Sequence, residues 1–200
     1  MPKRLPVAAL AALPVLLLAG AASAHTGQGD HGGLAAGFLH SVLGLDHLLA
    51  MVAVGAYAAR QGGRAMWAVP ATFVALMVVG GALAWRGVEL PLVEPGIALS
   101  VVLFGALVAL DRRLPLVAGM ALGGLFALAH GQAHGAEMPA AAHPAAYALG
   151  FVLATAALHG AGLALVRGLV RALDSLPARW AIRVAGAATV FAGAGLAAGA

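Results

Sequence analysis

Two short segments of this sequence place histidines and carboxylates inside stretches that are otherwise apolar. They are HSVLGLDH at residues 40–47 and HGQAHGAE at residues 130–137, and their ionisable residues are His40, Asp46, His47, His130, His134 and Glu137. An ionisable side chain in hydrocarbon costs about 3 kcal/mol on insertion scales. A single histidine in a span could be a core residue with its hydrogen bonds satisfied, but three ionisable groups within residues 40–47 favour a function. Imidazole and carboxylate suit Ni(II), Co(II) or Zn(II). The two segments therefore predict binding of a divalent transition-metal ion.

The second segment carries the stronger local metal signal. His130 and His134 are four residues apart, about 6 Å along a helix axis, and two imidazoles at this spacing can hold one ion. Glu137 stays on the same face if the helix continues past Gly135. The alternative interpretation is a polar cap at the end of a membrane span.

The first segment leaves two possibilities open. His40 and His47 share a helix face but are two turns apart, about 10.5 Å along a straight helix. One ion cannot be held by both at that distance, because metal–nitrogen bonds are about 2 Å long. Either the two histidines serve successive sites, or Gly44 opens the helix between them. Asp46 is expected to point about 100° away from His47, toward a neighbouring helix.

Other candidates lie outside these segments. His159 is near the middle of an apolar run, where packing and a role on a metal pathway are equally good interpretations. Glu94 stands at a helix start, where a carboxylate can complement the helix dipole or bind an arriving ion. His31 and His143 are expected to be solvated loop residues.

The composition indicates a membrane protein. Sixty-two per cent of the 200 residues are hydrophobic and only 9 per cent are charged, which is too little charge for a soluble surface. Cysteine is absent, so disulfides and thiolate ligands are excluded. The excess of 11 Lys and Arg over 7 acidic residues need not mean nucleic acid, and no nucleic-acid partner is expected.

The N-terminus has the pattern of a secretory signal peptide. Lys3 and Arg4 precede an apolar stretch at 5–20, and Ala22-Ser23-Ala24 follows as a small-residue cleavage site. Cleavage after Ala24 makes His25 the new N-terminal residue, whose amine and imidazole together form a metal chelate. An uncleaved first span is the alternative.

The rest of the chain predicts an all-α fold, a polytopic membrane bundle with six transmembrane helices after a cleaved signal peptide. Residues 1–24 are assigned to the signal and residues 25–200 to one permease-like domain. The apolar runs lie at 34–59, 65–85, 96–110, 115–133, 145–166 and 180–199. Most approach the ~20 residues that a helix needs to cross ~30 Å of hydrocarbon.

The arginines predict how this bundle is oriented. With the mature N-terminus outside, eight arginines fall on the cytoplasmic side and only Arg86 falls outside, as the positive-inside rule requires. The eight are Arg60, Arg64, Arg112, Arg113, Arg167, Arg171, Arg179 and Arg183. Both mature termini are then periplasmic, and the outer face is relatively rich in acids and histidines.

At the two histidine segments the sequence resembles the HupE/UreJ family of bacterial nickel and cobalt permeases. GLDHLLAMVAVG, LPLVEPGIALSV and YALGFVLATAALHGAG fit the family's pattern as well, and the likeness covers most of residues 25–165. This sequence departs from the family's pattern at Ala129 and Gln132, where some members have further histidines nearby. The resemblance implies a six-helix permease that imports Ni(II) or Co(II) for enzymes such as hydrogenase and urease.

Together these features predict a secondary transporter in the bacterial inner membrane, not an enzyme. The ion is its cargo and no permanently bound cofactor is expected. The sequence has no GxxxxGK[ST] loop for ATP. The alternative is an intramembrane zinc-dependent hydrolase that uses Ser41 and Asp46. Against it, HExxH is absent and the histidines are expected to spread from the outer face to mid-membrane. A metal sensor or chaperone partner is a third possibility, without a sizeable soluble domain to support it.

Overall fold

The computed structural model describes residues 33–199, and this part of the chain is helical without any strand. Its helices are α3 (Gly33–Leu43), α4 (Leu45–Gln61), α5 (Ala65–Trp85), α6 (Val93–Ala109), α7 (Leu116–Ala136), α8 (Pro144–Ala172) and α9 (Ser175–Gly199). The all-α prediction is confirmed for these residues. The predicted signal peptide at 1–24 and the candidate ligand His25 lie outside them.

The helices have the length and apolar character of membrane spans. α5, α7, α8 and α9 are each long and apolar enough to cross a membrane, and α3 and α4 meet the same criterion together as one bent span. α6 is apolar but has 17 residues, about 25 Å of helix against ~30 Å of hydrocarbon. The described helices agree with the predicted membrane helical bundle.

The largest differences between the predicted runs and the observed helices lie at two places. The run at 34–59 forms two helices, because the chain breaks at Gly44, where α3 and α4 meet at a bend of 78°. The run at 145–166 continues as helix to Ala172, and α9 begins at Ser175, so the expected long join between them is only two residues. Its arginines lie on helical turns, where their long stems can cover apolar surface.

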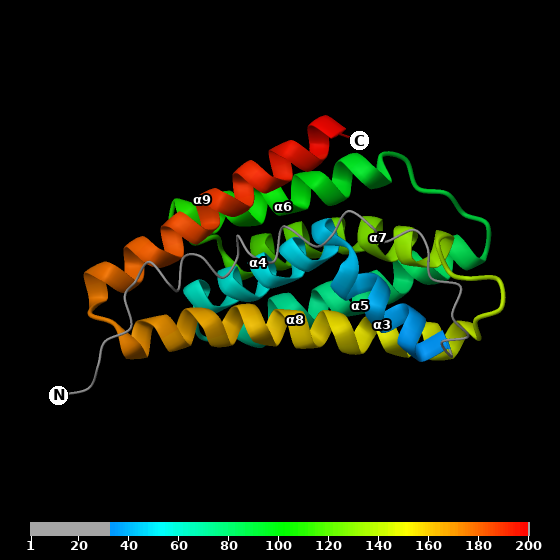
Figure 1. Cartoon of the computed structure of the whole chain (residues 1–200), viewed down its shortest axis with the longest axis horizontal. Coiled ribbons are helices and arrows are strands. Elements are labelled where there is room, and N and C mark those ends of the chain that lie inside the picture. The colour runs from blue at the N-terminus through cyan, green and yellow to red at the C-terminus, as the bar shows by residue number, and fades with distance from the viewer. Residues whose placement is uncertain (1–32, 200) are drawn as a thin grey trace.

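The helices form an elongated bundle in which neighbours pair closely (Figure 1). α5 packs chiefly on α7, α6 on α9, and α8 on both α3 and α4. Glycines at the crossings allow this approach. A side chain at Gly150 of α8 would overlap the carbonyl oxygen of Leu34 in α3, and one at Gly131 of α7 would overlap that of Met77 in α5. Small residues are the usual means of close helix contact in lipid, where apolar burial gives no driving force.

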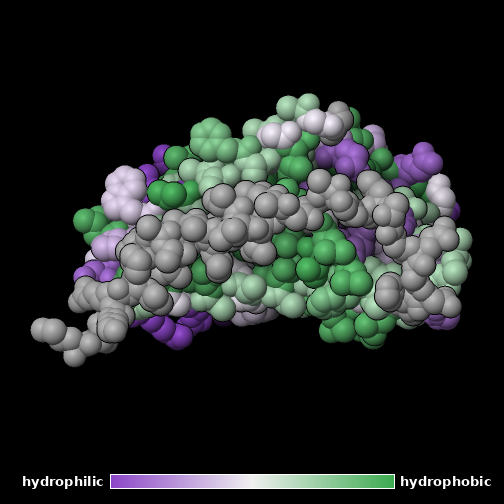
Figure 2. All heavy atoms as spheres, in the orientation of Figure 1, coloured by the Kyte–Doolittle hydropathy of each residue, from purple (hydrophilic) through white to green (hydrophobic). Residues whose placement is uncertain are grey.

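The connections alternate between the two ends of the bundle. α4–α5, α6–α7 and α8–α9 are joined at one end, which carries the eight arginines predicted to be cytoplasmic (Figure 1). α5–α6 and α7–α8 are joined at the opposite end. On the face shown in Figure 2, hydrophilic residues gather mostly toward the two ends and hydrophobic residues dominate between them. This distribution fits a bundle that crosses a membrane along its long axis.

Polar contacts tie the helices together at the arginine-rich end. Arg60 at the end of α4 donates from Nε to Asp111 in the α6–α7 connection at 2.9 Å, and its Nη2 also pairs with this carboxylate. Gln61 donates to the carbonyl of Leu114 at 2.7 Å. Arg183 of α9 donates to the carbonyl of Ala109 at 2.8 Å. The α6–α7 connection is therefore held from both α4 and α9.

The Arg60–Asp111 pair predicts a pH-dependent contribution to stability. The guanidinium of Arg60 holds the pKa of Asp111 below its ordinary value of 3.8. A carboxyl group whose pKa is lower in the folded state stabilises the fold at any pH above its pKa in the unfolded state. This stabilisation is lost as the pH falls through the pKa of the folded state. Asp111→Asn is expected to lower Tm at pH 7, and the difference from the original protein should shrink below pH 3.8. Thermal unfolding in detergent checks this, and a Tm difference that is constant with pH would contradict it.

Candidate metal centre

The break at Gly44 brings the two histidines of the first segment together. In a straight helix His40 and His47 would be two turns apart, but here their ring centroids are 5.5 Å apart. Gly44 has an extended backbone (ψ 110°), while its N–H still donates to the carbonyl of His40 and its own carbonyl accepts from Leu48. The second of the two possibilities left by the sequence is the observed one.

The two histidines of α7 complete a cluster with them. The ring of His134 lies 4.8 Å from His40 and 4.7 Å from His47, and the ring of His130 lies 4.7 Å from His47. We call His40, His47, His130 and His134 the four-histidine cluster. His130 and His134 are fully buried, His47 is 4% exposed, and His40 lies at the rim. The two histidine segments, which are far apart in the sequence, therefore meet in one place.

The spacing within the cluster is close to that of a metal centre. One ligand atom from each of His40, His47 and His134 lies within 4.8 Å of the other two. Nitrogens bound to one ion at about 2 Å are at most about 4 Å apart, so small ring rotations would bring the three into coordination. His130 lies beside these three, with its ring 4.7 Å from that of His47.

Asp46 fixes the tautomer of His47. Its Oδ1 lies 2.9 Å from His47 Nδ1 and also accepts the backbone N–H of His47 at 2.7 Å. A carboxylate only accepts, so Nδ1 carries the proton and Nε2 keeps a lone pair. Asp46 was expected to meet a neighbouring helix, but it is turned back onto the next residue of its own helix. This is the carboxylate–histidine arrangement that supports metal ligands in proteins.

Serine hydroxyls fix the two buried histidines of α7 in the same way. Ser100 donates to the carbonyl of Ile97 at 2.6 Å, so its oxygen accepts from His130 Nε2 at 3.0 Å. Ser41 bonds weakly to the carbonyl of Gly37 at 3.5 Å and contacts His134 Nε2 at 3.3 Å. In His130 the proton is therefore on Nε2 and Nδ1 keeps the lone pair, while in His134 Nε2 is the nitrogen that contacts the serine.

Each deeply buried member of the cluster therefore has one nitrogen fixed by an oxygen and one that is uncommitted. His47 Nε2, His130 Nδ1 and His134 Nδ1 have no hydrogen-bond partner within residues 33–199. A buried polar atom left unpaired costs about 1–3 kcal/mol. Three unpaired imidazole nitrogens close to one another suit a Lewis-acidic cation.

Carboxylates lie at the rim of the cluster. Glu137 follows the last residue of α7, is half exposed, and places Oε2 3.5 Å from His40 Nε2. Asp46 and Glu94 line a cavity of about 500 Å³ between α4, α6 and α9. Glu94 lies in the first turn of α6 and is exposed. Of the predicted acidic ligands, Glu137 and Asp46 touch the histidines, and Glu94 is placed beside Asp46.

His159 is separate from the cluster. The ring of Phe73 lies between, 5.5 Å from the ring of His130 and 5.2 Å from that of His159. The predicted spread of histidines from the outer face to mid-membrane is therefore wrong for four of the five, which meet in one place because the bend at Gly44 returns His40 to His47. Among the buried histidines of residues 33–199, only His159 lies away from the cluster. His143 is exposed at the start of α8, as expected for a solvated loop residue.

Three residues of the site were not identified as part of it from the sequence. Ser100 is the single hydroxyl residue of an apolar helix, and this isolation is the signal that could have found it. Phe151 stacks on His134 with ring centroids 4.7 Å apart and a 13° interplanar angle. Phe73 and Phe151 look like ordinary core residues in the sequence, so nothing local marks them.

The described residues form an apolar helical bundle with buried histidines whose unpaired nitrogens could bind a metal ion. These features are those of a membrane protein with a candidate metal centre. The HupE / UreJ protein family profile matches residues 13–196 of the chain. Protein HupE of Rhizobium leguminosarum bv. viciae is 42% identical over 184 residues, covering 92% of this chain and 94% of that protein. The chain belongs to the HupE/UreJ family, which confirms the resemblance noted from its motifs. No solved structure matches.

The Asp46–His47 contact predicts a loss of metal affinity without loss of the fold. Asp46→Asn removes the charge that holds the ligating tautomer of His47, and the Kd for Ni(II) is expected to rise by about 10–100-fold. Isothermal titration of the purified full chain in detergent measures it. Glu89→Gln is the matched control, because it removes the same charge from an exposed position in the α5–α6 connection. Equal affinities of Asp46→Asn and Glu89→Gln would show that Asp46 does not support the site.

Proposed function

We propose that this protein is a secondary transporter that moves Ni(II), or Co(II), inward across the bacterial inner membrane. The observation that carries this proposal is the set of unpaired ring nitrogens on His47, His130 and His134 in an apolar bundle. An imidazole and carboxylate set is suited to these ions. Membership of the HupE/UreJ family supports metal transport as the role of the site.

The distribution of charge supports the inward direction. The cluster lies toward the end opposite the arginines, since His134 is in the last turn of α7, which leads into the α7–α8 connection. By the positive-inside rule the arginine-rich end is cytoplasmic, which makes the cluster and both mature termini face the periplasm. An inside-negative potential of 100 mV then favours entry of a divalent ion by ~4.6 kcal/mol.

The proposed sequence of events begins with capture at the acidic rim. Glu137, Asp46 and Glu94 attract a hydrated ion, with His25 as a further ligand at the processed N-terminus. The four-histidine cluster then replaces part of the water shell with imidazole nitrogens. The cargo is released to the cytoplasm, where it supplies metalloenzymes such as hydrogenase or urease.

The hydrolase alternative differs in what the bound ion would do. An intramembrane zinc hydrolase would also hold an ion among histidines, and Ser41 lies beside His134. Yet the Ser41 hydroxyl lies between the Gly37 carbonyl and a nitrogen of His134. This position suits a residue that orients a histidine ligand better than one that attacks a substrate. Assays on the same proteoliposomes separate the two functions, with metal accumulation expected and hydrolysis of a lipid amide not expected.

Removal of single cluster histidines is expected to abolish transport. His47→Ala and His134→Ala each remove one proposed imidazole ligand from a buried site. Uptake of radioactive nickel should therefore fall by about 10-fold or more. Proteoliposomes with an imposed inside-negative potential provide the measurement. His143→Ala, at an exposed position, is the control and should transport normally. Undiminished uptake by both cluster variants would exclude this mechanism.

A further inference from the structure

Phe151 of α8 lies flat against His134, a member of the four-histidine cluster. Their ring centroids are 4.7 Å apart and the ring planes differ by only 13°. The other ring contacts that the cluster makes within residues 33–199 are tilted or edge-on, with interplanar angles from 53° to 89°. Both Phe151 and His134 are fully buried. One face of the His134 ring is therefore covered by a flat apolar surface.

The helices around Phe151 leave its ring little freedom. Gly37 of α3 packs directly on α8 here, since a Cβ added at Gly37 would lie 3.1 Å from the backbone nitrogen of Phe151. The tip of the ring reaches α5, where a Cβ added at Gly81 would lie 3.6 Å from Phe151 Cζ. The ring of Tyr147 stands edge-on to it at 5.8 Å. The phenyl ring is thus enclosed by α3, by α5 and by the preceding turn of α8.

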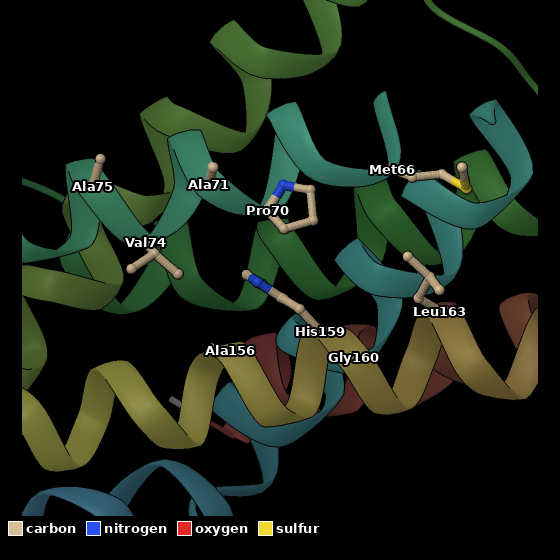
Figure 3. A pocket seen from close by; sticks show the side chains of 9 residues that line it. All are labelled: Met66, Pro70, Ala71, Val74, Ala75, Ala156, His159, Gly160 and Leu163. Carbon is tan, nitrogen blue, oxygen red and sulfur yellow. The ribbon is translucent and has the colours of Figure 1, made fainter. Parts of the chain in front are cut away.

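The side chain of Phe151 reaches across to a helix on which α8 does not chiefly pack. The main partners of α8 are α3, α4 and α5, and α7 is not among them. Farther along α8, on the same helix face, His159 extends toward Pro70 of α5 and lines a cavity of about 500 Å³ (Figure 3). At the level of the cluster the large ring of Phe151 instead extends from α8 past α5 to His134 of α7.

This contact restrains the direction in which His134 can bind an ion. The lone pair of an imidazole nitrogen lies in the plane of the ring, so a bound ion must lie near that plane. The terminal torsion of a histidine side chain is broad, and only its surroundings fix the ring plane. Rotation of the His134 ring would drive its edge into the face of Phe151. The hydroxyl of Ser41 contacts Nε2 at 3.3 Å, so the unpaired nitrogen is Nδ1.

From this geometry we infer that Phe151 is a positioning residue for the metal centre, whose phenyl face holds the plane of His134 so that the ring can share an ion with His40 and His47. These three histidines are the ones whose ligand atoms lie within 4.8 Å of one another. The inference rests on the proposed metal-transport function. It gives α8, which supplies no histidine to the cluster, a part in preparing the ligands. A ring that is already held loses less freedom when it binds an ion, and this raises affinity.

The test separates the flat face of Phe151 from its apolar volume. Phe151→Met fills the space with a flexible apolar chain, Phe151→Leu repeats the loss of the face with a different shape, and Phe151→Tyr keeps the face. Phe126→Met is the matched control, because Phe126 is a buried ring that packs on Phe104, with centroids 6.3 Å apart. Ni(II) titration of the full chain in detergent measures Kd. The d–d absorption of the Co(II)-loaded protein reports the geometry of the ligands, and thermal unfolding reports the fold.

The variants without a flat face should bind more weakly. Phe151→Met and Phe151→Leu are expected to raise the Kd for Ni(II) about tenfold, as loss of a group that orients a ligand does, and to alter the Co(II) spectrum. Phe151→Tyr and Phe126→Met should keep both the affinity and the spectrum of the original protein. Both methionine variants should lower Tm, because each removes a buried aromatic ring.

Two results would overturn the positioning role. One is an original Kd and Co(II) spectrum in both Phe151→Met and Phe151→Leu. The other is an equal change in Phe126→Met, because the effect would then follow from a loosened bundle. The transport proposal fails by a different result, which is an original protein that binds Ni(II) but accumulates none in proteoliposomes. The role of Phe151 at the metal centre would stand in that case.

Discussion

The site depends on imidazole nitrogens that have no hydrogen-bond partner within residues 33–199. Asp46, Ser100 and Ser41 each contact one nitrogen of a histidine, and the opposite nitrogen of the same ring is unpaired. With His159 included, five buried ring nitrogens lack partners within the described residues. A buried polar atom that stays unpaired costs about 1–3 kcal/mol. Such a cost is retained where a cation offsets it.

The fold brings the histidines together by bending the span made of α3 and α4 and by packing α7 beside it. The 78° turn between α3 and α4 places His40 beside His47, and α7 adds His130 and His134 from one face. α3 is held to α8 by a close backbone contact at Gly150, so the bend is braced from outside the site. The positions of the ligands are thus set by helix contacts, and the oxygens that orient the rings come from three different helices.

Much of the fold could be predicted from the sequence, because apolar run length is a local property. The run at 65–85 matches α5, and the spacing of His130 and His134 correctly placed both on one face of a helix. The break at Gly44 could not be decided, because its extended backbone (ψ 110°) is one that any residue can adopt. Packing of α3 against α8 accompanies the bend, and that contact joins segments far apart in the chain. Ser100 escaped notice for the same reason, since it meets His130 only across a helix interface.

The account requires imidazole nitrogens to replace water around the transported ion, and X-ray absorption spectroscopy of the nickel-loaded protein measures this directly. The expected spectrum has nitrogen or oxygen neighbours at about 2 Å and the multiple-scattering signature of at least three imidazole rings. The Asp46→Asn protein should lose part of that signature. A spectrum that fits a shell of water and carboxylate oxygens, without imidazole scattering, would contradict the central claim.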